Sequence, residues 1–191
     1  MIPPILCHAQ RMSMRIDLGS FVIRSFKSSD APSIAKHANN REIWINLRDR
    51  FPHPYTREDA RDWVHLATSM TPESNFAIAV EDQVVGGIGI LQQNDVHAHS
   101  AEFGYWLGQE YWGKGIMTRA VAEMSNYFFA NFDLVRLYAT VYEWNPASAR
   151  VLEKCGWELE GRLKKSVFKD KKFCDQLIYA KLNTDKMAQY K

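Results

Sequence analysis

Cysteine is scarce in this sequence, and its spacing excludes two kinds of small domain. The 191 residues include only Cys7, Cys155 and Cys174, an odd number with no two close together. A disulfide framework needs paired cysteines, and a structural zinc site needs Cys or His ligands at short spacing. The sequence therefore predicts neither a disulfide scaffold nor a metal site. Its cysteine usage fits a reducing, cytoplasmic compartment.

Long apolar runs and a strong charge bias are also missing. No run approaches the roughly 20 apolar residues that a membrane-spanning helix needs. The apolar residues 1–6 are too short for a signal peptide, and Arg11 and Arg15 follow them instead of preceding them. A formal net charge of +2 is too small to predict nucleic-acid binding. We therefore expect no membrane association and no nucleic-acid partner, while a homodimer is compatible with the sequence.

The composition and hydrophobic pattern predict one α/β domain. Hydrophobic residues make up 46% of the chain and charged residues 24%, which is ordinary for a globular protein. We expect a flexible extension over 1–16, a single domain over 17–183 and a tail over 184–191. The periodicity predicts strands at 21–26, 75–80, 84–91, 101–107, 135–142, 157–168 and 172–182, and helices at 29–39, 41–47, from Thr56, 115–129 and 145–154. This order predicts a mixed, mostly antiparallel sheet with one parallel pair, flanked by helices.

A pair of glycines between a strand and a helix is the most informative local feature. Gly113 and Gly115 open the predicted helix 115–129, where backbone N–H groups and the helix dipole favour a phosphate. A Walker loop needs four residues between its glycines, so that hypothesis fails. A dinucleotide fingerprint needs a third glycine where Thr118 stands and glycines closer to the strand. That hypothesis stays open because the acidic Glu143 follows the next strand.

Four segments, in order, resemble a known family. Glu110-Tyr111-Trp112-Gly113-Lys114-Gly115 resembles the coenzyme A signature Gln/Arg-x-x-Gly-x-Gly/Ala of the GCN5-related N-acetyltransferase (GNAT) family, with Glu110 departing from it. Residues 145–148 and 152–157 resemble the family's Asn-x-x-Ser and Glu-Lys-x-Gly-Phe segments. Residues 171–180 resemble the last strand of its ribosomal-protein N-acetyltransferase-like branch, which modifies protein N-termini, antibiotics or polyamines. The resemblance covers about residues 17–183.

The resemblance implies a fold, a cosubstrate and a set of site residues. The parallel strands 101–107 and 135–142 are expected to splay, with the pantetheine arm of acetyl-coenzyme A (acetyl-CoA) in the gap. The implied contacts are Trp106, Leu107, Gly108, Trp112, Gly113, Lys114, Gly115, Ile116, Met117, Thr118, Asn145 and Ser148. The acid tyrosine of many family members is replaced here by Leu152. Ser148 then stands where the branch carries a serine for the departing thiolate, although a first-turn serine can also simply satisfy a backbone N–H.

The resemblance implies direct attack of a primary amine on acetyl-CoA, which needs a neutral amine and stabilised oxyanion and thiolate. We name Glu102 as the candidate base, although an outward-facing strand residue explains it equally well. A weak base suits an α-amine, with a pKa of about 7.7–8.0, better than a lysine, at about 10.4. A polyamine or other small amine stays open. The alternative function is a non-catalytic acyl-CoA binder or sensor.

A basic segment and a group of aromatic residues are two further features of the sequence. The segment 162–172 holds six basic residues and one acidic residue, which fits either an acidic partner or a solvated hairpin. Four aromatic residues, Trp44, Phe51, Tyr55 and Trp63, are predicted to cover the acceptor side while packing small helices on the sheet.

Overall fold

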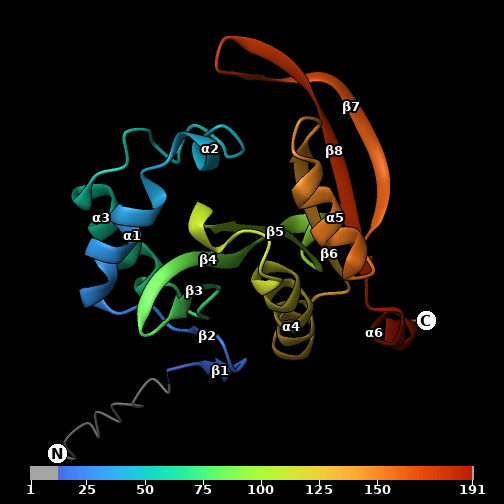
Figure 1. Cartoon of the computed structure of the whole chain (residues 1–191). Helices are drawn as coiled ribbons and strands as arrows, with labels where there is room; N and C mark the ends of the chain where they lie inside the picture. The colour runs from blue at the N-terminus through green and yellow to red at the C-terminus, as the bar shows by residue number, and fades with distance from the viewer. Residues whose placement is uncertain (1–12, 191) are drawn as a thin grey trace, which may run out of the picture.

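The computed structural model describes residues 13–190, which form one mixed sheet with helices on both faces (Figure 1). The sheet order is β1-β2-β3-β4-β5-β6-β8-β7. The strands are β1 (Arg15–Asp17), β2 (Val22–Arg24), β3 (Asn75–Val80), β4 (Gln83–Gln92), β5 (Ser100–Leu107), β6 (Arg136–Tyr142), β7 (Glu158–Lys169) and β8 (Lys172–Leu182). Only β5 and β6 pair in parallel among these strands, which confirms the predicted architecture.

Among residues 13–190, five of the six α-helices lie where capping residues and apolar periodicity predict them, and the sixth lies in the expected C-terminal tail. They are α1 (Ala31–Ala38), α2 (Arg41–Trp44), α3 (Arg57–Ser69), α4 (Ile116–Asn131), α5 (Pro146–Lys154) and the short α6 (Thr184–Met187). A capping box opens α3 at the predicted position, because Thr56 accepts from the Asp59 N–H while the Asp59 carboxylate accepts from the Thr56 N–H.

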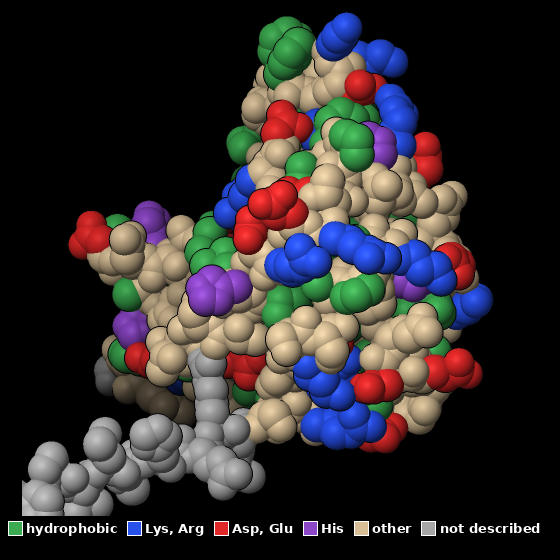
Figure 2. Space-filling view, turned by 90° about the vertical axis from the view of Figure 1, so that its left-hand side faces the viewer, with side chains coloured by type: hydrophobic (Ala, Val, Ile, Leu, Met, Phe, Trp, Pro, Cys, Tyr) green, Lys and Arg blue, Asp and Glu red, His purple; other side chains and the backbone are tan. Residues whose placement is uncertain are grey.

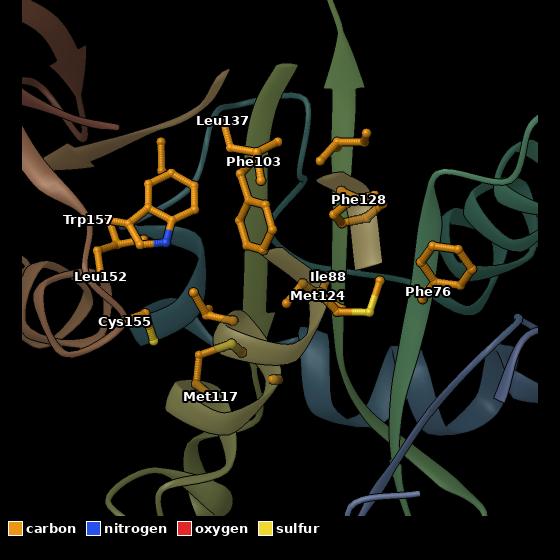
Figure 3. Packing of buried hydrophobic residues seen from close by; sticks show 14 of the residues in the cluster. Phe76, Ile88, Phe103, Met117, Met124, Phe128, Leu137, Leu152, Cys155 and Trp157 are labelled. Atoms are coloured by element: carbon orange, nitrogen blue, oxygen red, sulfur yellow. The ribbon is translucent and has the colours of Figure 1, made fainter. Parts of the chain in front are cut away.

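Two apolar clusters hold the helices to opposite faces of the sheet. The larger cluster joins β4, β5 and β6 to α4 and α5 (Figure 3). Phe103 of β5 lies 5.8 Å from Phe128 of α4 and 5.3 Å from Trp157, between ring centroids. The smaller cluster joins α1 and α3 to β3 and β4 through small residues such as Ala60 and Ala77. Side chains alternate between the two faces along β5, so neighbouring residues of that strand serve different clusters.

Both expected domain boundaries lie inside ordered structure. β1 begins at Arg15 and pairs with β2, so the sheet starts before residue 17. Residues 1–12 of the expected extension lie outside the described residues. The expected tail begins with α6, and Lys186 in it donates to the Phe132 carbonyl at 2.7 Å. Strand pairing at the N-terminal end and this hydrogen bond at the C-terminal end therefore extend the packed structure beyond residues 17–183.

Three glycines in β4 explain how the centre of the sheet packs. An added Cβ on Gly86 would lie 2.5 Å from the Trp106 carbonyl oxygen, and one on Gly89 would lie 2.2 Å from Asn75 Oδ1. These glycines therefore allow a close approach to the neighbouring strands. The register between β3 and β4 also shifts after Ile78, as a bulge requires.

Candidate active site

The site begins where the two parallel strands separate. β5 and β6 share only three register pairs, which end at Glu102 and Tyr138. Beyond them β5 stays paired with β4, and β6 stays paired with β8. Within residues 13–190 no strand covers the edge of β5 after Glu102. An uncovered strand edge presents N–H and C=O groups that an extended ligand can pair with.

Backbone hydrogen bonds show which residues present that edge. Arg136 N–H on the β6 side donates to His99, whereas Gly108 N–H donates to Val85 O in β4 at 2.7 Å. The backbone N–H and C=O groups of successive residues point to opposite sides of a strand. The backbone groups of Phe103, Tyr105 and Leu107 therefore point to the side away from β4, where the open edge lies.

The coenzyme A contacts expected at the end of β5 are Trp106, Leu107 and Gly108. Of these, Leu107 alone points its backbone groups to the open edge. The peptide groups of Trp106 and Gly108 serve the β4 pairing instead. The Leu107 carbonyl already accepts from Trp112 Nε1 at 2.7 Å, which ties the glycine turn to the end of β5. The N–H groups that point to the uncovered edge beyond the last pair with β6 therefore belong to Tyr105 and Leu107.

The glycine turn has the geometry of an anion site. Gly113 and Gly115 have φ angles of 73° and 74°, a left-handed conformation that favours glycine. An added Cβ at either position would meet nothing within 4 Å, so the turn is open on that side. Gly115 caps α4, and Arg119 N–H is bonded to the Gly115 carbonyl. The N–H groups of Ile116, Met117 and Thr118 have no partner within the helix and carry its positive dipole end.

The side chains around the turn leave its backbone as the main ligand surface. Ile116 and Met117 are buried in the larger cluster, and the Lys114 ammonium lies 5.2 Å from the Tyr111 ring centroid. Glu110, which departs from the family signature, turns towards α1, where its Oε1 lies 3.5 Å from His37 Nδ1. Burial lowers the pKa of His37, so the imidazole is neutral at neutral pH and this contact is not an ion pair there.

The Glu110 contact leads to a prediction about affinity. Since the carboxylate is directed at α1, Glu110→Gln is expected to leave the Kd for coenzyme A unchanged or to lower it. Isothermal titration with coenzyme A measures this, and Glu158→Gln on β7 is the matched control for loss of one exposed carboxylate. A clear loss of affinity in Glu110→Gln alone would show that this carboxylate supports the turn.

Asn145 and Ser148 come together at the start of α5. Asn145 Oδ1 accepts from the Ser148 N–H at 3.1 Å, which is a helix cap. The Ser148 hydroxyl instead lies 2.8 Å from the Tyr105 hydroxyl. The simpler explanation of Ser148, in which its hydroxyl satisfies a backbone N–H, therefore does not describe this structure.

Tyr105 is the site residue that the sequence did not reveal. It belongs to the predicted strand 101–107, and its hydroxyl reaches from β5 across the separated strands to α5. Burial raises the pKa of this phenol well above its ordinary value, so it remains protonated. No local signal predicts a contact between residues 43 positions apart.

Glu102 lies on the opposite face of β5 from Tyr105. Arg48 donates to its carboxylate, and Thr140 Oγ1 lies 3.3 Å from the same oxygen. The side chain is only 15% exposed, so it is not the outward-facing residue that the sequence also allowed. Glu143, the acidic residue that kept the dinucleotide hypothesis open, is bonded to Arg162 and to the backbone N–H of Asp175.

The aromatic residues predicted to cover the acceptor side divide between three contacts, of which only that of Trp44 reaches the tip of the β7–β8 hairpin. Phe51 packs on Tyr55 at 4.7 Å and on Trp106 at 6.0 Å, between ring centroids. The buried Lys169 ammonium lies 3.7 Å from the Trp44 ring centroid and 2.7 Å from Asp49 Oδ1. These contacts fix the hairpin against α2 and the loop after it. Trp63, the fourth residue, packs on Phe26 instead.

Charges on the hairpin fall into two groups. Arg162 and Lys165 are paired with Asp175, whose pKa falls to about 2 because the Lys165 N–H and the Arg162 guanidinium bond to its carboxylate. Lys164, Lys171 and Lys172 have no ion-pair partner within the part of the chain that the structure describes. Figure 2 shows Lys and Arg side chains beside hydrophobic ones at the top of the molecule, over this hairpin.

Among residues 13–190 no three His, Cys, Asp or Glu side chains are placed to hold a metal ion. In the same range no helix combines the length and the apolar character needed to cross a bilayer.

Comparison with known proteins agrees with this geometry. The model of the acetyltransferase (GNAT) domain matches residues 20–158. A spermidine N(1)-acetyltransferase of Escherichia coli (strain K12) is 27% identical over 150 residues, covering 78% of each chain. A ribosomal-protein-S5-alanine acetyltransferase from Vibrio fischeri superposes with a TM-score of 0.78 at 26% identity, over 90% of this chain and 98% of that one. A ribosomal L7/L12 α-N-protein acetyltransferase in complex with coenzyme A shares the fold, with a TM-score of 0.78 at 19% identity over 88% and 98%.

Proposed function

This chain belongs to the acetyltransferase (GNAT) family, and from that premise we propose that its acceptor is the α-amine of an acidic protein N-terminus. It is an acetyl-CoA-dependent N-acetyltransferase that acylates a primary amine.

The open edge of β5 and the glycine turn support the cosubstrate assignment. In our proposal the pyrophosphate binds the N–H groups between Gly113 and Thr118, and the pantetheine arm pairs with the edge at Phe103, Tyr105 and Leu107. One of these N–H groups stabilises the oxyanion that forms when the amine attacks the thioester carbon. Asn145 and Ser148 lie across the gap, where Ser148 donates a hydrogen bond to the thiolate as the carbon–sulfur bond breaks.

The contacts of Glu102 favour an amine that loses its proton readily. Its carboxylate is already bonded to Arg48 and to Thr140, so only part of its hydrogen-bonding capacity is left for an amine or a water. An α-amine has a pKa of about 7.7–8.0, so a useful fraction is neutral near pH 7, unlike a lysine at about 10.4. In our proposal Glu102 accepts the amine proton through water.

The charges around the acceptor side favour an acidic peptide over a polyamine. A polyamine needs free carboxylates, yet those near the hairpin have cationic partners: Glu102 with Arg48, Asp49 with Lys169, Asp170 with Arg41, and Glu143 and Asp175 with Arg162. Glu42 on α2 is the exception. The unpaired cations Lys164, Lys171 and Lys172 instead favour a negatively charged partner.

Acceptor preference is tested by thiol release from acetyl-CoA. We expect a peptide with acidic residues after its free N-terminus to have a kcat/KM at least about tenfold above its lysine-substituted counterpart, because each well-placed charge contact is worth about 1 kcal/mol or more. The same acidic peptide with a blocked N-terminus and an internal lysine should release no thiol. Spermidine as the fastest acceptor would contradict the proposal.

A further inference from the structure

Tyr105 and Ser148 form a bridge across the gap between the two halves of the sheet. Tyr105 comes from the open edge of β5, and Ser148 from the first turn of α5 beyond the end of β6. The two hydroxyl oxygens lie 2.8 Å apart, and the Tyr105 oxygen also lies 3.3 Å from the Ser148 carbonyl oxygen. Figure 1 shows β5 and α5 on the two sides of the gap where β5 and β6 diverge.

Other bonds leave this pair free for a function beyond holding α5 in place. Asn145 already caps the helix through the Ser148 N–H. Tyr179 of β8 anchors the other end of α5, because its hydroxyl donates to Glu153 at 2.9 Å. The Ser148 hydroxyl is therefore not needed for the cap, and α5 has a separate tether to the sheet.

The bridge allows two arrangements of its hydrogens. In one, Tyr105 donates to the Ser148 carbonyl and Ser148 donates to the Tyr105 oxygen. In the other, Tyr105 donates to Ser148 Oγ, which leaves the single serine hydrogen free for another acceptor. A sulfur anion beside Ser148 favours the second arrangement, since a hydrogen bond to a charged group is stronger than one between neutral hydroxyls.

We propose that Tyr105 is a positioning residue for the leaving thiolate of coenzyme A, which directs the Ser148 hydroxyl hydrogen at the sulfur by donating its own hydrogen to Ser148 Oγ. When the carbon–sulfur bond breaks, its electron pair leaves with the sulfur, and Ser148 stabilises that charge by a hydrogen bond. Tyr105 keeps its proton, and the thiolate is protonated later from solvent. The raised pKa of Tyr105 agrees with this role, because a phenol that resists ionisation acts as a donor rather than as an acid.

This inference rests on the proposed role of Ser148, but its test needs no acceptor amine. The probe is coenzyme A bound to the full-length enzyme, whose thiol is titrated by the ultraviolet absorbance of the thiolate. Tyr105→Phe is expected to raise the pKa of the bound thiol, with about a tenfold fall in its acid dissociation constant. Ser148→Ala should raise that pKa at least as much. The double variant should equal Ser148→Ala, since Tyr105 acts through the serine.

Tyr179→Phe is the matched control, because it removes a tyrosine hydroxyl that also bonds α5 without contact to Ser148. It should leave the pKa of the bound thiol at the wild-type value even where it lowers the melting temperature. A wild-type thiol pKa in Tyr105→Phe would overturn the inference, as would equal shifts in Tyr105→Phe and Tyr179→Phe. Additive shifts in the double variant would also overturn it. The double variant leaves no unpartnered hydroxyl, so it remains measurable if Tyr105→Phe alone folds poorly.

Because acceptor preference does not enter this titration, the two proposals fail separately. A fast reaction with spermidine would overturn the acidic N-terminus and leave the thiol measurement intact. A wild-type thiol pKa in Ser148→Ala would instead remove the thiolate role of both residues, whatever the acceptor.

Discussion

Asp30→Ala is expected to lower the free energy of unfolding by about 3–5 kcal/mol, the cost typical of breaking a buried ion pair from one side. Asp30 and Arg24 make two hydrogen bonds of 2.8 Å, and both side chains are only 4% exposed. The same carboxylate accepts from the Lys27 N–H at 2.8 Å, where the chain turns from β2 into α1. Without it the buried guanidinium keeps the carbonyl oxygens of Ser25 and Asp82 but loses its buried carboxylate partner. Urea unfolding measured by circular dichroism gives the value.

Asp82 supplies the control for this prediction. It also approaches Arg24, at 3.5 Å, but its side chain is 71% exposed. Exposed ion pairs contribute about 0–1 kcal/mol, so Asp82→Ala should stay within that range. If the two variants were equally stable, the buried pair would not hold the junction of β2 and α1.

Gly115→Ala is expected to raise the Kd for coenzyme A roughly 100-fold, which corresponds to about 2.7 kcal/mol. An alanine at a φ of 74° costs about 1–2 kcal/mol in the left-handed region. The added methyl would also project into the open side of the turn, where the N–H groups meet the pyrophosphate in our proposal. Loss of one or two bonds to a charged group, at about 1.5–3 kcal/mol each, accounts for the fall in affinity. Isothermal titration with coenzyme A measures it.

Gly156 separates backbone strain from ligand binding. It has a φ of 75°, and an added Cβ there also meets nothing within 4 Å, but it lies after α5 rather than in the turn. Gly156→Ala should therefore lower stability about as much as Gly115→Ala and leave the Kd unchanged. Equal losses of affinity in both variants would mean that strain alone explains the result.

Local signals predicted most of the fold. Thr56 and Asp59 define the start of α3, Asn145 and Pro146 define the start of α5, and alternating apolar residues define the central strands. β1 was missed because Arg15–Asp17 is too short to show a period and is ordered by pairing with β2.

The site was predicted less completely, because its side chains meet across the sheet. The glycine turn and the Asn145 cap depend on neighbours in sequence, so their patterns are readable. Glu102 and Arg48 lie 54 positions apart, and Tyr105 and Ser148 lie 43 apart. The register between β5 and β4 decides whether the odd-numbered or the even-numbered residues of β5 point their backbone groups to the open edge. No motif encodes that register, which is why Trp106 and Gly108 were expected at an edge that Phe103, Tyr105 and Leu107 present.

The short run of three register pairs between β5 and β6 makes the two halves of the sheet a nearly divided structure. A cosubstrate that pairs with β5 would act as the missing strand, so part of the fold would be supplied by the metabolite. Its binding energy then appears as resistance to unfolding, about 2.7 kcal/mol at a free concentration one hundred times the Kd. The survival of such an enzyme in a cell becomes coupled to the supply of acetyl groups that it uses.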